Sequence, residues 1–282
     1  MAINLNQPST LIFHPGIGKT ATTAIQELGL RLNTDDPESA CFSPFGVIGG
    51  AHNGLSSNHP LFNRSNFQTE WKKILEFANG RNACTVISSE FLIRDHPAHI
   101  KELIMSAKSS GLEIKVVVAT RNYTDYLISA FLQAVKVNWG VPDNEDIFAF
   151  CERELAQIRM PLLADNWSRF IGDENVFLMD YDKEKENFVD LFFDSIGAQL
   201  ANSNKKENIV NESIKIEIAP MLRHFDRISN DKEQRAELIK YLNTLNYNKQ
   251  YAENIKKRIE TSVVRNAFSH DKERLTARYT WI

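Results

Sequence analysis

One stretch near the start of the chain determines how the rest is arranged: Leu11-Ile12-Phe13-His14-Pro15-Gly16-Ile17-Gly18-Lys19-Thr20-Ala21-Thr22-Thr23. Its first residues are apolar, as in a short buried strand. A proline and two glycines then predict a turn, and a lysine followed by threonines opens an amphipathic helix. Backbone N–H groups of a turn and a helix start point at one spot, which the helix dipole makes positive. We therefore predict a cradle for a phosphate or sulfate ester.

Side chains strengthen this predicted cradle. Lys19 adds a full positive charge, and hydroxyl donors come from Thr20, Thr22 and Thr23. The phosphate-binding loop of NTPases has the pattern G-x-x-x-x-G-K-[ST], and its second half fits the sequence from Gly18 onward. Its first glycine would fall at Phe13, where an aromatic residue cannot take the backbone conformations of glycine.

A second match is to sulfotransferases that use 3'-phosphoadenosine-5'-phosphosulfate (PAPS). Their K-[ST]-G-T-T loop resembles the segment Gly18-Lys19-Thr20-Ala21-Thr22-Thr23-Ala24-Ile25-Gln26. In that family the loop holds the 5'-phosphate and the transferable sulfonyl group. The resemblance therefore implies that the cofactor is bound by Gly18, Lys19, Thr20, Ala21, Thr22 and Thr23. Ala21 stands where the family usually has glycine, and alanine tolerates the dihedral angles of a helix.

Composition restricts the class of protein. The chain has 282 residues, of which 43% are hydrophobic and 24% charged, as is ordinary for a soluble globular protein. A net charge of −3 argues against wholesale nucleic-acid binding, so a phosphate site must be local. Three scattered cysteines form neither a disulfide framework nor a metal motif, which favours a reducing compartment. Without a signal peptide or an apolar run of about 18 residues, we expect a cytoplasmic protein with no integral membrane contact.

Apolar runs and helical periodicity alternate along the chain. Further strands are predicted at 83–88, 113–120 and 175–180, with helices between them. Residues 146–171 form one long helix or two helices broken near Pro161, and 35–65 form a long irregular region. The alternation predicts an α/β fold, a P-loop-like parallel sheet with helices on both faces. We expect a single domain over 1–282, with an α/β core at 1–200, a helical C-terminal part at 201–282 without strands, and a candidate hinge at 202–208.

A second element begins at the end of the predicted strand 113–120. Arg121 follows this strand, and Ser129 lies eight residues later on the polar side of the next helix. An arginine and a serine so placed can grip one phosphate together. This pair resembles the 3'-phosphate element of the sulfotransferases, and the resemblance implies that Arg121 and Ser129 hold the 3'-phosphate of the cofactor. Taken alone, Arg121 would be interpreted as the cap of a strand, and Ser129 as a serine on the solvated face of a helix.

A third element, Ser88-Ser89-Glu90, follows the predicted strand 83–88. Glu90 should therefore lie at the same sheet edge as Lys19. Sulfuryl transfer needs a base for the acceptor's proton and positive charge at the leaving group. Similarity to the family assigns the base to Glu90 and the stabilisation of the leaving group to Lys19. His52 is the rival catalytic base because histidine titrates near neutrality, while Glu90 has the alternative of pairing with Arg94.

The resemblance continues more loosely at Trp167 to Tyr181-Asp182, at Asn211-Glu212-Ser213 and at Arg274 to Tyr279. It implies a cytoplasmic sulfotransferase that transfers a sulfonyl group from PAPS, without a metal, to a hydroxyl or amine of a small-molecule or carbohydrate acceptor. Two alternatives remain. A P-loop nucleotide kinase or NTPase would need magnesium, for which Asp180 is a candidate ligand. A non-catalytic binding protein could keep the same fold. The sequence predicts no nucleic-acid partner and leaves the acceptor and the oligomeric state open.

Overall fold

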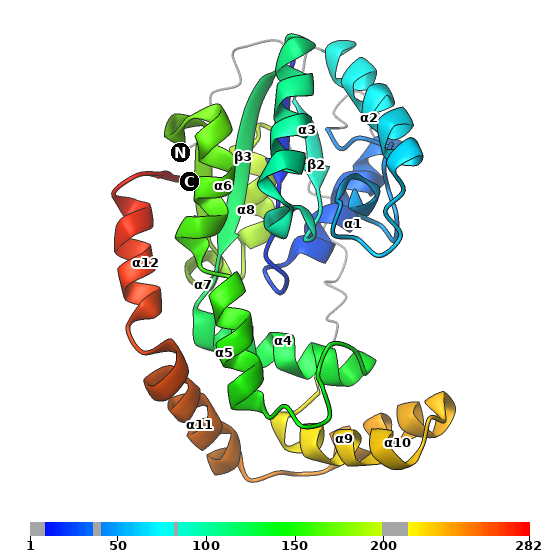
Figure 1. Ribbon diagram of the computed structural model, residues 1–282, viewed down its shortest axis with the longest axis vertical. Coiled ribbons are helices and arrows are strands. Elements are labelled where there is room, and N and C mark those ends of the chain that lie inside the picture. The colour runs from blue at the N-terminus through cyan, green and yellow to red at the C-terminus, as the bar shows by residue number, and fades with distance from the viewer. Residues whose placement is uncertain (1–8, 36–40, 82–83, 199–213) are drawn as a thin grey trace. The chain divides into compact units, whose positions relative to one another are not determined.

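The computed structural model describes residues 9–35, 41–81, 84–198 and 214–282 (Figure 1). The chain divides into two compact units. The first unit contains the described residues of Met1–Arg121, Met160–Ile209 and Lys272–Ile282, and the second those of Asn122–Arg159 and Val210–Asp271. The candidate hinge at 202–208 and the segment Asn211-Glu212-Ser213 lie outside the described residues. The single domain remains a prediction.

A five-stranded parallel sheet forms the centre of the first unit. Its strands have the order β2-β1-β3-β4-β5 and are β1 (Thr10–His14), β2 (Thr85–Ser88), β3 (Glu113–Thr120), β4 (Val176–Asp180) and β5 (Thr280–Trp281). Strand β1 lies between β2 and β3 and pairs with both, so Phe13 lies between Ile87 and Val116. Parallel pairing places the carboxyl ends of all these strands at one edge.

Helices cover both faces of this sheet, as predicted. One face packs on α1 (Thr22–Asp35) and α8 (Phe188–Ser195) through a cluster that includes Ile12, Val86 and Val117. On the other face, the ring of Phe13 lies 6.1 Å from Trp71 and 5.0 Å from Trp167, between centroids. Those residues belong to α2 (Arg64–Asn79) and α6 (Met160–Ile171), and α6 packs on α3 (Pro97–Ser109). The alternation of Ile12 and Phe13 along β1 thus supplies both cores.

Two expectations about element boundaries have clear outcomes. Of the two arrangements that the sequence left open for 146–171, the structure has two helices, α5 (Ile147–Gln157) and α6. Pro161 itself lies in the first turn of α6, where the missing N–H costs nothing. The expectation of no strand after residue 201 is wrong, because β5 pairs with Phe177 and Leu178 of β4. A two-residue strand is too short to show periodicity in the sequence.

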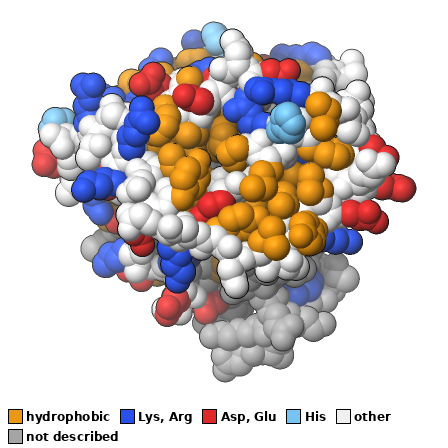
Figure 2. Space-filling view, turned by 90° about the horizontal axis from the view of Figure 1, so that it is seen from below, with side chains coloured by type: hydrophobic (Ala, Val, Ile, Leu, Met, Phe, Trp, Pro, Cys, Tyr) orange, Lys and Arg blue, Asp and Glu red, His pale blue; other side chains and the backbone are white. Residues whose placement is uncertain are grey.

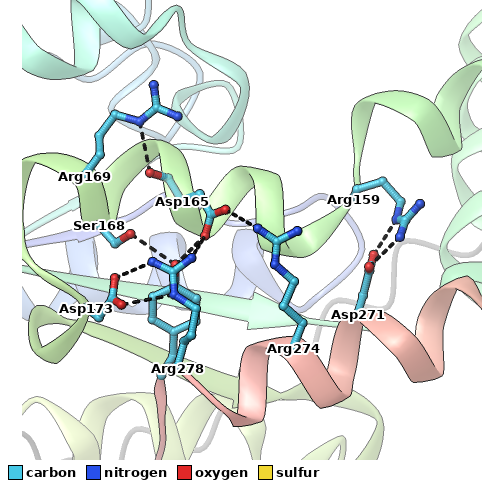
Figure 3. A network of polar contacts seen from close by, with 9 residues as sticks. Arg159, Asp165, Ser168, Arg169, Asp173, Asp271, Arg274 and Arg278 are labelled. Carbon is cyan, nitrogen blue, oxygen red and sulfur yellow. Dashed lines mark hydrogen bonds and ion pairs between the residues drawn. The ribbon is translucent and has the colours of Figure 1, made fainter.

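The C-terminal residues are fixed to the first unit by a network around Asp165 of α6 (Figure 3). The Asp165 carboxylate accepts hydrogen bonds from Arg274 Nη2 and Arg278 Nη1, each at 2.7 Å, and from the Tyr279 hydroxyl at 2.7 Å. Arg278 also forms an ion pair of 2.8 Å with Asp173. These contacts hold the chain just before β5 against α6.

The second unit is helical. Its elements are α4 (Tyr123–Val137), α5, η5 (Ile216–Ile218), α9 (Ala219–Ile228), α10 (Lys232–Thr244), α11 (Lys249–Arg258), η6 (Ile259–Val264) and the start of α12 (Ala267–Thr276). Within this unit, buried Asp271 accepts a hydrogen bond of 2.6 Å from the Tyr123 hydroxyl. It also accepts hydrogen bonds from Arg159 (Figure 3). Side chains of large apolar residues are exposed in this unit at Val137, Trp139, Met221, Ile228, Tyr241 and Tyr251.

Figure 2 shows one face of the molecule, on which apolar side chains gather between charged ones. Among the described helices, none is both long enough and apolar enough to cross a membrane. In the first unit, the short helix α7 (Tyr181–Glu184) directly follows β4.

Candidate functional site

The loop between β1 and α1 has an unusual backbone. Lys19 has a φ of 70° and Ala21 a φ of 55°, whereas Thr20 between them has an ordinary negative φ. Such alternating handedness directs successive N–H groups into one concavity, the geometry of an anion-binding nest. Left-handed dihedrals at residues other than glycine store strain and cluster at functional sites. The loop lies at the carboxyl edge of the sheet, directly before the N-terminus of α1.

Ala21 corrects an expectation from the sequence. We expected helical dihedral angles at this position, but its φ of 55° is left-handed and α1 begins one residue later, at Thr22. A left-handed conformation costs an alanine about 1–2 kcal/mol. Glycine avoids this cost, which explains physically why the similar loops usually carry glycine at this position.

The two glycines of the loop allow close approaches. A Cβ atom at Gly16 would lie 2.9 Å from the Thr22 side chain. At Gly18 it would lie 3.2 Å from Oε2 of Glu90. The absence of a side chain at Gly18 therefore lets the Glu90 carboxylate lie directly against the loop.

The buried threonine hydroxyls brace the loop from inside. Thr20 is fully buried and donates a hydrogen bond of 2.7 Å to the Ile17 carbonyl oxygen. The Thr22 hydroxyl lies 3.3 Å from that of Thr20 and hydrogen-bonds the Glu90 carboxylate, whereas Thr23 is exposed. Because the Thr20 hydroxyl proton is used within the loop, anion binding by this residue depends on its backbone N–H.

Glu90 and Lys19 meet at this edge of the sheet. Glu90 comes two residues after β2 ends, and its carboxyl group is largely surrounded by protein. This burial raises the pKa of Glu90, although the positive charge of Lys19, the hydrogen bond from Thr22 and the charge of Arg94 each act to lower it. A raised pKa makes a carboxylate a stronger proton acceptor.

Arg121 joins the same loop from a distant part of the sequence. It follows β3, and its Nη1 donates a hydrogen bond of 2.6 Å to the carbonyl oxygen of Lys19, 102 residues away. Its guanidinium carbon lies 5.3 Å from the centre of the Tyr181 ring, at the start of α7. Among the described residues, its buried Nε atom has no hydrogen-bond partner. The guanidinium thus keeps an unused donor beside the loop.

Ser129 lies in α4, in the second unit, whereas Arg121 is the last residue of this segment of the first unit. The pairing of Ser129 with Arg121 therefore remains a prediction. Within its own unit, α4 begins with a well-formed cap, because the Asn122 side chain accepts hydrogen bonds from the N–H groups of Thr124 and Asp125. Asp125 in the first turn also pairs with Lys256 at 2.6 Å.

His52 is buried, and both of its ring nitrogens are in use. Nδ1 lies 3.0 Å from the backbone nitrogen and 3.2 Å from the carbonyl oxygen of Ser88, and Nε2 lies 2.8 Å from the Ser43 carbonyl oxygen. Burial is the largest effect on this ring and lowers the pKa of His52 to about 4. The geometry makes His52 a clamp between the 43–56 loop and the end of β2, with no nitrogen left for a substrate proton.

The Ser88 side chain makes several buried contacts that could not be predicted from the sequence. Its hydroxyl lies 2.9 Å from Nδ1 of His14 and accepts a hydrogen bond of 3.1 Å from Gln26. The next residue, Ser89, donates a hydrogen bond of 2.6 Å to Asn53. These contacts position the backbone that leads to Glu90. The only signal in the sequence was the place of the two serines, between a strand and a glutamate.

Two further features of the first unit bear on ligands. A cavity of about 260 Å³ lies at the carboxyl end of β4, and it is lined by Asp180, Lys183, Glu184, Lys272, Thr276, Trp281 and Ile282. Within it, Lys272 pairs with Asp180 at 2.6 Å. Across the part of the chain that the structure describes, no group of three or more His, Cys, Asp or Glu side chains is placed to hold a metal ion.

No protein-family model and no curated protein matches this sequence. Among solved structures, the chain is similar to a sulfotransferase from Alicyclobacillus acidocaldarius, with 11% identity and a TM-score of 0.43 over 86% of this chain and 97% of that one. It is similar to retinol dehydratase in a complex with retinol and PAP, with 12% identity and a TM-score of 0.37 over 93% of this chain and 83% of that one. A third similar structure is the sulfotransferase domain from the curacin biosynthetic pathway, with 11% identity and a TM-score of 0.38 over 90% and 97%.

Proposed function

We propose that this protein is a sulfotransferase that uses PAPS and transfers its sulfonyl group to a hydroxyl or amine. The observation that carries the proposal is the hydrogen bond between Arg121 and the Lys19 carbonyl. The two sequence elements that resemble the cofactor-binding motifs of this family therefore meet at one edge of the sheet. Both bring positive charge to a loop whose backbone has the form of an anion nest.

The residues present suit a doubly phosphorylated adenosine. In this proposal the loop from Gly18 to Thr23 holds the 5'-phosphate, with Lys19 beside it, and Arg121 uses its free Nε donor for the 3'-phosphate, helped by Ser129. When bound, PAPS supplies the sulfonyl group that is transferred. Lys19 stabilises negative charge on the bridging oxygen as the leaving group departs.

Glu90 is the proposed general base. Its carboxylate would accept the proton from the acceptor hydroxyl or amine as the acceptor attacks. The close approach to Gly18 puts this carboxylate against the loop that would hold the donor, and its raised pKa suits proton abstraction. His52 does not take this role in the proposal, because its ring nitrogens hold the 43–56 loop.

The kinase or NTPase alternative is less well supported. Phe13 is a fully buried residue of β1 that packs on Trp167, so this strand residue cannot supply the first glycine of the NTPase loop. Asp180, the candidate magnesium ligand, caps α7 and pairs with Lys272. The acceptor in the proposal is a small molecule or a carbohydrate, and the reaction takes place in the cytoplasm.

Thermal shift assays test the donor site directly. We expect adenosine 3',5'-bisphosphate, the desulfated cofactor, to raise the melting temperature of the wild-type protein without magnesium. Lys19→Ala and Arg121→Ala should lose most of this shift, while Lys73→Ala, on the exposed side of α2, should keep it. Stabilisation by ATP only in the presence of magnesium would instead support the kinase.

Turnover distinguishes the enzyme from a non-catalytic binding protein. With PAPS labelled at sulfur, we expect slow release of sulfate from the wild type, and transfer when a panel of sugars, alcohols and amines is supplied. Lys19→Ala should abolish both. A protein that binds the bisphosphate but neither releases nor transfers label would be the binding protein with the same fold.

A further inference from the structure

Two cysteines of the first unit lie side by side outside the proposed site. Cys41 and Cys84 are 3% and 7% exposed and belong to the same hydrophobic cluster. Their segments pair directly, because the N–H of Val86 donates a hydrogen bond of 2.5 Å to the Cys41 carbonyl and the N–H of Ser43 donates one of 3.1 Å to the Val86 carbonyl. The 41–43 segment thus lies along β2, although the two cysteines are 43 positions apart in the sequence.

The pairing brings the backbones of the two cysteines close together. Phe42 is opposite Val86 in parallel orientation, so Cys41 is offset by one residue from Cys84. A strand spacing near 4.8 Å and a rise near 3.3 Å put such offset Cα atoms about 6 Å apart. Disulfides occur most often at Cα separations of about 5.5–6 Å. In a regular ladder, side chains offset by one residue point to opposite faces. Cys41 and Cys84 nevertheless belong to the same hydrophobic cluster, and their thiols are within hydrogen-bonding reach of each other.

We propose that Cys41 and Cys84 form a reversible intramolecular disulfide, a site of oxidative modification that fixes the 41–43 segment to β2. Both cysteines are free thiols in this structure. The oxidant that we name is hydrogen peroxide, because a small molecule reaches a nearly buried pair more readily than a peptide disulfide does. The proposal stands apart from the proposed sulfotransferase activity.

The reaction balances in two steps. The Cys84 thiolate attacks one oxygen of peroxide, the O–O bond breaks, and hydroxide leaves as a sulfenic acid forms. The Cys41 sulfur then attacks Cys84 Sγ, the S–S bond forms, the S–O bond breaks, and hydroxide leaves. The two hydroxides take up the two thiol protons. Two electrons from the thiols thus reduce one peroxide to two waters.

The electrostatics of the pair assign these roles. The hydrogen bond from the Cys41 thiol lowers the pKa of Cys84, whereas the same hydrogen bond and burial raise the pKa of Cys41. The positive charge of Arg81 favours the thiolate at both residues. In the proposal we therefore take Cys84 as the attacking thiolate and Cys41 as the resolving thiol.

Cys151, in the second unit, provides an internal control. It is fully buried, and burial together with nearby carboxylates raises the pKa of Cys151 to about 12. It should therefore stay reduced under conditions that oxidise the pair.

Mass spectrometry of the full-length protein tests the proposal. Mild peroxide treatment should lower the intact mass by two hydrogens and leave one of the three thiols open to alkylation in denaturant. Peptide mapping should find Cys41 linked to Cys84 and Cys151 alkylated, and dithiothreitol should restore all three thiols. Oxidation of Cys151 at the same rate, or stable sulfinic acid at Cys84 without a link, would overturn the proposal.

A variant separates the two steps. In Cys41→Ser, peroxide should leave a sulfenic acid on Cys84 that dimedone traps, because the resolving thiol is gone. Cys151→Ser should form the disulfide like the wild type. If Cys41→Ser does not fold, the wild-type mapping repeated in guanidinium chloride decides, since unfolding should remove the preference for the Cys41–Cys84 pair. An unchanged preference there would contradict the role of the folded geometry.

Discussion

At the scale of single residues, the loop after β1 holds two residues in conformations that suit glycine. We predict that Ala21→Gly raises the free energy of unfolding by about 0.5–1 kcal/mol, because relief of a left-handed alanine outweighs the backbone entropy that glycine loses. The matched change Ala24→Gly, inside α1, should instead lower it by about 1 kcal/mol. Urea denaturation measures both. Equal losses in the two variants would contradict a left-handed residue 21.

Glu90→Gln should separate catalysis from stability. Transfer should fall by about 10²–10⁴-fold, the usual contribution of a general base, while the shift by adenosine 3',5'-bisphosphate persists. Because burial raises the pKa of Glu90, this carboxyl group ionises at a lower pH in the unfolded chain than in the folded protein. The ionised group therefore lowers the free energy of unfolding once the pH exceeds the pKa of the unfolded chain. The melting temperature of Glu90→Gln minus that of wild type should therefore increase from pH 4 to pH 8.

The control for this prediction is Glu76→Gln. Glu76 is an exposed residue of α2 whose contact with Lys72 is 3.8 Å long, so its difference from wild type should change little over the same range. A flat difference for Glu90→Gln as well would show that the carboxyl group is not buried. Full transfer activity in Glu90→Gln would exclude Glu90 as the base.

At the scale of elements, the C-terminal residues depend on one carboxylate. We predict that Asp165→Asn lowers the free energy of unfolding by about 1–2 kcal/mol, since it weakens contacts with Arg274, Arg278 and Tyr279 together. Asp194→Asn, at an exposed position of α8, should change it by less than about 0.5 kcal/mol. Urea denaturation measures the two changes. Similar values would mean that the network contributes nothing to stability.

The sequence predicted the longer elements because their patterns are strong. The β-branched run of β3 and the apolar run of β2 indicate buried strands, and their order implies a parallel sheet. It could not reveal β5, because two residues have no period and the partner strand is a hundred residues away.

The candidate site was predictable only in part, for reasons of the same kind. Motif spacing indicated that Lys19, Glu90 and Arg121 belong at one edge, and the structure brings these three together. It did not indicate the backbone angle at Ala21, which the turn imposes on the residue. Nor did it show that His52 is a clamp, since that depends on which carbonyl and N–H groups surround the ring.

At the scale of the whole molecule, two buried histidines connect stability with pH. Burial lowers the pKa of His14 to about 3 and that of His52 to about 4. Both pKa values lie below that of a histidine in the unfolded chain, near 6.5. The neutral rings therefore contribute their full share to the free energy of unfolding above pH 6.5, and this contribution is lost as the pH falls toward 4. Each histidine should lower the free energy of unfolding by about 2 kcal/mol as the pH falls from 7.5 to 5.

We therefore expect the free energy of unfolding to fall steeply over this range. In His52→Asn the fall should be smaller by about 2 kcal/mol, whereas His270→Asn, at an exposed position of α12, should keep the wild-type slope. Urea titrations at the two pH values measure this. If the free energy of unfolding falls as much with pH in His52→Asn as in the wild type, the His52 ring is protonated in the folded wild-type protein as readily as in the unfolded chain.

The positive φ of Lys19 has a consequence for the way this protein tolerates change. One position meets two separate requirements, a backbone turn that favours glycine or asparagine and a cation that only lysine or arginine supplies. In a saturation library, variants that fold well and variants that retain the ligand would therefore be different sets of amino acids at codon 19. Lysine is a compromise between them, so selection for thermal robustness alone would remove the charge.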